Sequence, residues 1–424
     1  MARLEQALQL RQLAQRLAAS DETDACHPAL VFGALARLQK ARPRLIASLR
    51  ASLGQQASRR SQHPKLQLWQ SLATPNQVSS NDLSELLTAI RKTEAWQKAC
   101  TADARHRSVW SQEPWNHQAR LDNAPELLRH LEAAFQPHQA VKLFFWHHFD
   151  ALGFLPQSWH NVLAALVQQG WVVVVSSSGL AANAEAALLR CGCLISHRQN
   201  LGLCLGAYRD FCCLLDGQRH LRDRIQTLVL CNDSTLPLGG SKPFCLQTES
   251  IHQRLKSSEA KLMGLTDSVQ TRAYHIQTYF LALNSDLLSH SIWTDFWNAL
   301  DPRGHKDDLI QRGEVGLSQW LLRNNIAIEA VYSLTSILLN SATVNQALKQ
   351  LDLRQPEQIN TTLMCWNALL NAGCPVIKKQ LLLEPPDCLP QTIPLAELRA
   401  HLTAADEALI QDLAHLLQSR FIRP

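Results

Sequence analysis

The stretch "VKLFFWHHFDALGFLPQSWHNVLAALVQQGWVVVVSSS", residues 141–178, decides the fold class. Two short runs rich in β-branched and aromatic residues, 141–149 and 170–178, enclose a segment with helical spacing that ends at Gly170. Strands that alternate with helices are typical of a mainly parallel sheet. The sequence therefore predicts that an α/β domain begins here.

The same alternation continues along the chain. A second helical segment, 181–192, precedes the strand-like run "CLISHRQN" (193–200), and "IQTLVLCND" (225–233) is typical of a further strand. On either side the apolar residues recur with helical spacing. We predict a helical N-terminal region (1–135), an α/β domain (136–315) and a helical C-terminal region (316–424).

Composition and charge set bounds on the class of protein. The 424-residue chain carries a net charge of +5, and no segment approaches the roughly 18 apolar residues of a membrane span. The N-terminus lacks the apolar core of a secretory signal. Twelve cysteines without a CxxC pair favour reduced thiols in a cytoplasmic protein. No recognisable motif indicates nucleic-acid binding.

One stretch of the N-terminal region is strongly basic. Residues 25–81 contain no Asp or Glu, whereas eight Lys and Arg residues fall between positions 37 and 65. Such a stretch could bind an anionic membrane surface, which would place the protein at the inner face of the membrane. A solvated helix face is the alternative interpretation.

Polar residues follow the predicted strands. "SSSG", "HRQNLGLCLGAY" and "NDSTLPLGG" all fall at carboxyl ends of strands, where open α/β sheets bind ligands. Asn232, Asp233 and Ser234 offer hard oxygen atoms that suit a divalent cation bound to a diphosphate. The alternative is an Asx turn that closes the strand.

The stretch "RQNLGLCLGAYRD" follows the third predicted strand. Arg198 and Asn200 could contact a nucleotide or its phosphates. Gly202 and Gly206 could let the backbone come close to a ligand. The ordinary start of a helix is the alternative.

Two further clusters contain ionisable residues. Asp267 precedes His275 in "GLTDSVQTRAYHIQTYFLAL", and polar groups placed just before a buried element often line a site. Lys306 and Glu314 lie eight residues apart further on. Glu314 could act as a general base, or it could simply favour a helix N-terminus through the macrodipole.

Taken in order, five stretches resemble the rhamnan synthesis protein F family of bacterial glycosyltransferase-like proteins. They span 142–386 and read "FFWHHFDALGFLPQSWHNVLAAL", "RQNLGLCLGAYRD", "LVLCNDS", "MGLTDSVQTRAYHIQTYFLAL" and "NTTLMCWNALLNAGCPVIKKQLLLEPP". The last of them is similar to the family's Gly-x-Pro-x-x-Lys pattern. Cys204 stands where the family pattern has Asp.

The resemblance implies a GT-A-like, Rossmann-like fold that binds a nucleotide sugar. It implies Mg²⁺ or Mn²⁺ at Asn232, Asp233 and Ser234, and an inverting reaction with Asp267 or Glu314 as the base. Lys306 would then neutralise the leaving diphosphate. The other residues expected to bind the donor are Arg198, Asn200, Gly202, Gly206 and His275.

The implied reaction moves rhamnose or a related deoxyhexose to a hydroxyl of a cell-surface polysaccharide or a lipid-linked glycan. The alternative is a catalytically degenerate GT-A-like scaffold or partner subunit, and Cys204 favours that alternative.

Overall fold

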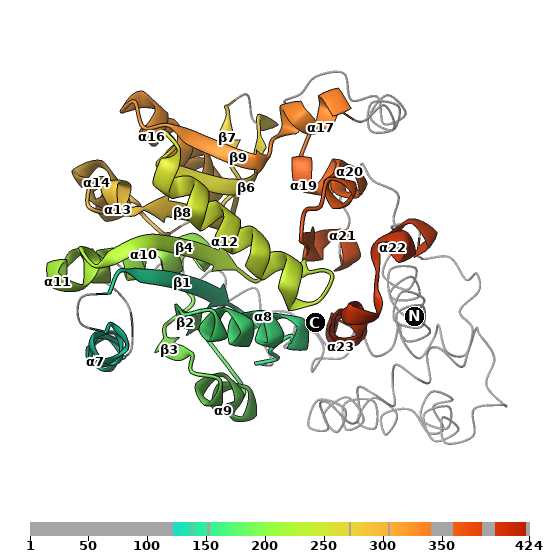
Figure 1. Ribbon diagram of the computed structural model, residues 1–424, viewed down its shortest axis with the longest axis horizontal. Helices are drawn as coiled ribbons and strands as arrows, with labels where there is room; N and C mark the ends of the chain where they lie inside the picture. The colour runs from blue at the N-terminus through green and yellow to red at the C-terminus, as the bar shows by residue number, and fades with distance from the viewer. Residues whose placement is uncertain are drawn as a thin grey trace, which may run out of the picture. The chain divides into compact units, whose positions relative to one another are not determined.

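The computed structural model describes Leu121 and residues 123–136, 139–150, 153–270, 273–303, 306–340, 359–383 and 395–420. The chain divides into two compact units, one of residues 1–112 with 410–424 and the other of residues 113–409. The second unit holds the central sheet (Figure 1). The basic stretch 37–65 lies outside the described residues.

A mixed, mostly parallel sheet forms the centre of the second unit and confirms the predicted α/β class. The strand order is β3-β2-β1-β4-β8-β6, with β9 paired to the far side of β6. β8 is antiparallel to both of its neighbours, whereas β1 to β4 run parallel. The bounds are β1 (Val141–His148), β2 (Trp171–Ser177), β3 (Leu194–His197), β4 (Ile225–Asn232), β6 (Leu262–Ser268), β7 (His275–Ile276), β8 (Phe280–Asn284) and β9 (Ile328–Tyr332).

Helices cover both faces of this sheet (Figure 1). Alternate residues of β1 show which helices lie where, because successive side chains of a strand point to opposite faces. Phe144 packs edge-on against Phe244 of α12, whereas Phe145 stacks on Phe211 of α10 with ring centroids 4.3 Å apart. Burying one such side chain contributes roughly 1.5–3 kcal/mol.

The helices between residues 124 and 323 are α7 (Ala124–Ala134), α8 (Gln157–Gln168), α9 (Ala182–Arg190), α10 (Leu203–Asp216), α11 (Arg219–Arg222), α12 (Ser241–Ser257), α13 (Ser285–Leu288), α14 (Ser291–Ala299), α15 (Lys306–Leu309), the π-helical turn η3 (Ile310–Val315) and α16 (Gly316–Arg323). The predicted helical segments 156–170 and 181–192 correspond to α8 and α9, whereas α11 to α15 were not predicted. Among the described residues, none of the helices has the length and apolarity that crossing a membrane requires.

The sheet continues past residue 315, where the sequence analysis placed the end of the α/β domain. β9 pairs in parallel with β6, and a short strand, β10 (Val376–Lys378), pairs with β5 (Thr235–Pro237). Both strands are short and lie among helical segments, so periodicity does not reveal them. The remaining elements are α17 (Leu334–Asn340), α19 (Thr361–Met364), α20 (Trp366–Asn371), α21 (Lys379–Leu383), α22 (Leu395–His401), η5 (Ala404–Asp406) and α23 (Glu407–Arg420).

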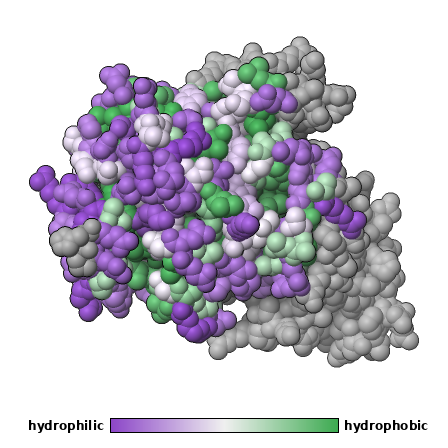
Figure 2. Space-filling model, viewed as in Figure 1, coloured by the Kyte–Doolittle hydropathy of each residue, from purple (hydrophilic) through white to green (hydrophobic). Residues whose placement is uncertain are grey.

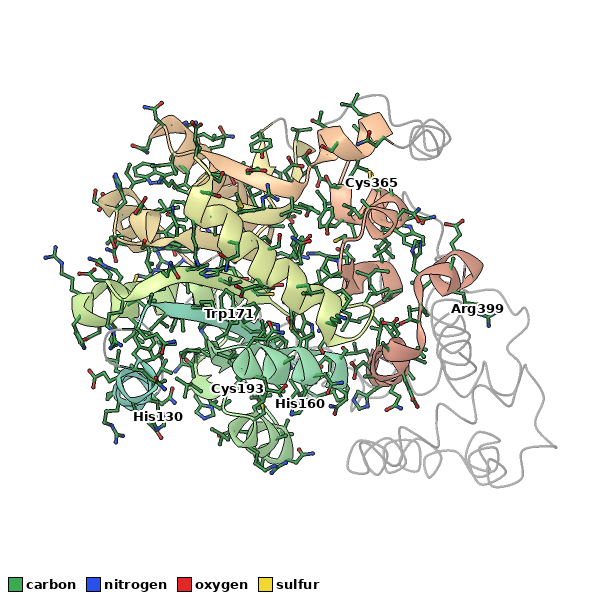
Figure 3. The ribbon with its side chains drawn as sticks, in the orientation of Figure 1. His130, His160, Trp171, Cys193, Cys365 and Arg399 are labelled. Carbon is green, nitrogen blue, oxygen red and sulfur yellow. The ribbon has the colours of Figure 1, made fainter. Side chains whose placement is uncertain are left out.

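Five of the tryptophans that the structure describes are buried in the core, namely Trp146, Trp159, Trp171, Trp293 and Trp297, whereas Trp320 is exposed. Trp171, labelled in Figure 3, begins β2, is 2% exposed and packs edge-on against Phe144. Hydrophilic residues cover much of the described part of the face drawn in Figure 2, and hydrophobic residues form smaller areas between them.

Candidate functional site

Four polar side chains form a row across the carboxyl ends of the parallel strands. The register pairs Ser196 of β3 with Ser176 of β2, Ser176 with His147 of β1, and His147 with Asn232 of β4. Side chains in register on neighbouring strands point to the same face. The row therefore lies on one face of the sheet, which is the face that α10 covers through Phe145.

Several buried polar atoms of this region make no hydrogen bond with the part of the chain that the structure describes. They are Nδ1 of His147, the hydroxyls of Ser176, Ser178 and Ser196, and both side-chain amide atoms of Asn200. A buried polar group without a partner costs about 1–3 kcal/mol. Their grouping at one edge of the sheet indicates a place where a polar ligand or water completes the hydrogen bonding.

Both histidines at the end of β1 are neutral at pH 7. Burial, followed by the charge of Arg198, lowers the pKa of His147 to about 3. Burial also lowers the pKa of His148. His148 Nε2 lies 2.8 Å from the carbonyl oxygen of Phe154, and its Nδ1 lies 3.0 Å from the hydroxyl of Ser177. Because a carbonyl can only accept, Nε2 carries the proton and Nδ1 accepts from the serine.

The Asn-Asp-Ser stretch forms a tight turn at the end of β4. Asn232 Oδ1 accepts a hydrogen bond from the backbone N–H of Ser234 at 2.9 Å, which is the Asx turn that we considered as the alternative. The Asp233 side chain projects from this turn and is 17% exposed. The turn therefore presents one carboxylate at the sheet edge.

Two consecutive lysines, which the sequence analysis did not select, meet this turn. Lys379 Nζ lies 2.9 Å from Asp233 Oδ2, and Lys378 Nζ donates to Ser234 Oγ at 3.0 Å. The Lys379 backbone N–H also donates to the Ser234 carbonyl at 2.9 Å. Burial acts to raise the pKa of Asp233, but the charge and hydrogen bond of Lys379 together with the two nearby histidines lower it below its usual value. The one sequence signal for these lysines is the Gly-x-Pro-x-x-Lys pattern, whose last residue is Lys378.

The Lys378 ammonium lies over the ring of Tyr279, 4.8 Å from its centroid. The Tyr279 hydroxyl accepts from Thr266 Oγ1 at 2.9 Å, which fixes the ring. Lys378 and Tyr279 also line a cavity of about 10 Å³, which is close to the volume that one water molecule needs.

Glu314 approaches the same edge from η3. Its side chain is 19% exposed, and Oε2 accepts from the backbone N–H and the hydroxyl of Thr278, both at 2.7 Å. The other oxygen, Oε1, lies 3.8 Å from Nε2 of buried His275. His275 is therefore a buried neighbour of the Glu314 carboxylate.

Electrostatic effects connect Glu314 with the lysines. Burial lowers the pKa of Lys378, and among the charges that act on it Glu314 raises this pKa while exposed Lys306 lowers it. Burial and then Glu314 raise the pKa of the half-buried Cys204 thiol to about 11. At pH 7 Cys204 is therefore a neutral group beside Lys378.

At Gly202 and Gly206 the backbone lies close to other segments of the protein. A Cβ on Gly206 would lie 2.0 Å from the carbonyl oxygen of Leu201, and one on Gly202 (φ +74°) would lie 2.4 Å from Pro302 Cβ. These glycines therefore shape the start of α10. Their predicted role toward a ligand stays a prediction.

Arg198 and Asp267 are held by protein partners. The Arg198 side chain is 0% exposed, and Nη2 lies 3.0 Å from Asp210 Oδ2. Asp267 is 5% exposed, and its Oδ1 accepts from the backbone N–H of Leu334, the first residue of α17, at 2.6 Å. Burial raises the pKa of Asp267. Asp267 thus fixes the start of a helix, whereas Glu314 is partly exposed and its charge acts on Lys378.

The oxygen atoms of the turn do not suit the predicted Mg²⁺ or Mn²⁺ site. Such ions need several hard oxygen ligands. Here Asp233 supplies the single carboxylate and is paired with Lys379, while the side-chain oxygens of Asn232 and Ser234 already accept hydrogen bonds. Within the described part of the chain, no group of three or more His, Cys, Asp or Glu side chains could hold a metal ion.

The chain was compared with protein families, curated proteins and solved structures. No family model and no curated protein matches the chain. Among solved structures the chain is similar to a mannosyltransferase from Pyrobaculum calidifontis in complex with GDP-Man and Mn²⁺, with 12% identity, 77% of this chain and 93% of that chain covered, and a TM-score of 0.26. A likeness at that TM-score carries no argument. The resemblance to the rhamnan synthesis protein F family stays a prediction.

Proposed function

We propose that this chain is a glycosyltransferase that uses a nucleotide-sugar donor. One observation carries the proposal: at a single sheet edge the Asp233 turn contacts Lys378 and Lys379, and the partly exposed carboxylate of Glu314 lies near enough for its charge to act on Lys378. Ammonium groups suit a leaving diphosphate, and a carboxylate within reach of it suits proton removal from a hydroxyl.

The row of polar side chains beside this group suits the nucleoside of the donor. The hydroxyls of Ser176 and Ser196 and the amide of Asn200 are buried and lack partners among the residues that the structure describes. Hydrogen bonds to a base or ribose would satisfy them. In open α/β sheets ligands bind beyond the carboxyl ends of the strands, and these residues lie there.

In this scheme Glu314 is the base. Its Oε2 is held by Thr278, which orients Oε1 to receive the proton of an acceptor hydroxyl. The acceptor oxygen forms a bond to the sugar C1 as the bond from C1 to the diphosphate oxygen breaks, and that oxygen keeps the electron pair. Attack opposite the leaving group inverts the configuration at C1.

The finer statements extend the same proposal. The donor sugar would be rhamnose or a related deoxyhexose, the acceptor a cell-surface or lipid-linked glycan, and the place of action the cytoplasmic face of the membrane. A non-catalytic GT-A-like scaffold is the second candidate. It is favoured by Cys204, whose neutral thiol provides neither a base nor a ligand at this edge.

The test measures transfer and binding separately. The full chain is incubated with UDP-, GDP- and dTDP-linked sugars and glycan acceptors, and its thermal midpoint is measured with each nucleoside diphosphate. One nucleotide should raise the midpoint, because it binds the native state alone. Glu314→Gln should keep this shift but lose about 10²-fold or more of the transfer rate. Asp307→Asn, an exposed site on α15, is the matched control.

Two results would count against the proposal. The absence of a midpoint shift with any of the nucleotides at millimolar concentration would favour the scaffold. Full transfer activity in Glu314→Gln would remove Glu314 from the base role.

A further inference from the structure

The Asn232–Ser234 turn supplies too few ligands for a metal ion. Two lysine ammonium groups from another segment contact it instead. Its carboxylate is paired with Lys379, its hydroxyl accepts from Lys378, and its amide oxygen accepts from the backbone. A divalent cation would have to displace an ammonium group from Asp233 and then find further hard oxygens. The positive charge that a diphosphate requires is already present at this turn.

Lys378 is a cation that makes no ion pair with the residues the structure describes. Within the described part of the chain, no carboxylate lies within ion-pair distance of its Nζ, which donates to Ser234 Oγ and lies over the Tyr279 ring. Partial burial of an ammonium group is costly unless an anion compensates it. Two of its three N–H donors remain for such an anion.

The backbone holds the two lysines against the turn. β10 pairs with β5 so that Lys378 lies opposite Thr235, and the Lys379 N–H donates to the Ser234 carbonyl. Neither lysine therefore depends on its own side-chain contacts to stay at this edge. Such preorganised charge stabilises a developing anion without reorganisation when the bond breaks.

We propose that Lys378 and Lys379 bind the diphosphate of the donor in place of a divalent metal. The proposal rests on the proposed function. The diphosphate oxygen that leaves C1 keeps its electron pair, and both ammonium groups stay protonated and donate hydrogen bonds to it. The acceptor proton passes to Glu314. Lys379 moves its hydrogen bonding from Asp233 to the diphosphate when the donor binds.

The test measures binding of UDP, GDP and dTDP to the full chain by calorimetry, in EDTA and in Mn²⁺. For the nucleotide that binds, the Kd in EDTA should be within about twofold of that in Mn²⁺. Lys379→Met should weaken binding about tenfold or more, which corresponds to roughly 1.4 kcal/mol, and Lys379→Arg should restore most of it. Lys261→Met, at an exposed ion pair with Asp286, should bind as the wild type does.

Asp233→Asn separates the two ways of binding a diphosphate. If Asp233 held a metal, this variant would lose nucleotide binding. If Lys379 binds the diphosphate, the variant should bind at least as well as the wild type, because the ammonium no longer has a competing carboxylate. This comparison does not depend on either lysine variant folding.

The outcomes of these experiments separate the lysine scheme from the proposed glycosyltransferase function. Binding that is tenfold weaker in EDTA and restored by Mn²⁺, or lost in Asp233→Asn, would overturn the lysine scheme and leave the glycosyltransferase proposal intact. If no nucleotide bound in either buffer, both would fall.

Discussion

At the scale of single residues, the Asp233–Lys379 pair decides what the sheet edge can bind. Its Nζ–Oδ2 distance is 2.9 Å, and the two side chains are 17% and 16% exposed. A pair at this depth lies between a solvent-exposed bridge, which contributes little, and a buried one, whose disruption costs about 3–5 kcal/mol.

The contribution of the Asp233–Lys379 pair to the free energy of unfolding should depend on pH. The native pKa of Asp233 is lowered, so its ionisation stabilises the fold above the unfolded pKa of about 3.9 and ceases to do so as the pH falls through the native value. Asp233→Asn should therefore cost about 1–2 kcal/mol at pH 7, and this cost should shrink as the pH falls below the unfolded pKa toward the lowered native one. Urea unfolding of both proteins across this range is the measurement. An equal loss throughout the range would mean that packing, not charge, is responsible.

The residues of this site differ in how far the sequence reveals them. Asn232, Asp233 and Ser234 follow an apolar run and so predict a polar strand end. Lys379 lies 146 residues from Asp233 in the chain, and no local pattern joins the two. In the sequence Asp267 and Glu314 are both acids beside other ionisable residues, and both were candidates for the base. Only the fold shows that one binds the α17 backbone while the other remains partly exposed.

At the scale of elements, the long apolar runs were predictable and the short strands were not. β1, β2 and β4 are seven or eight residues of mostly buried side chains, so composition alone marks them. β10 has three residues and derives its stability from pairing with β5. The reversed direction of β8 depends on its neighbours β4 and β6, which local sequence does not encode.

Gly206 in the first turn of α10 and Gly217, which follows its last residue, test how tightly the start of the helix is packed compared with its end. Gly206→Ala would place Cβ 2.0 Å from the Leu201 carbonyl oxygen, whereas in Gly217→Ala the nearest atom is 3.5 Å away. The first change should cost about 1–3 kcal/mol or more, because the loop before the helix must move. The second should leave stability unchanged or raise it by up to about 1 kcal/mol. Urea unfolding of both variants tests this, and equal stabilities would contradict it.

At the scale of the whole molecule, the sheet edge is assembled from segments far apart in the chain. The end of β4 leads into the turn, η3 supplies Glu314, β10 supplies Lys378, and the start of α21 supplies Lys379. Further on, Asp406 accepts from the Gly239 backbone N–H at 2.6 Å, after β5. Residues beyond 315 are therefore part of the site and of the fold that carries it.

Two fragments should show this dependence. Residues 113–409 form one compact unit and should unfold in a single cooperative transition. Residues 113–315 lack β9 and β10, so β6 keeps β8 but loses β9 from its other side over Leu262–Thr266, and β5 loses its only paired strand among the described residues. Buried apolar surface would be exposed along β6, and we expect this fragment to lack a cooperative transition. Urea unfolding followed by circular dichroism distinguishes the two. A cooperative transition in the shorter fragment would place the boundary of the folding unit at residue 315 after all.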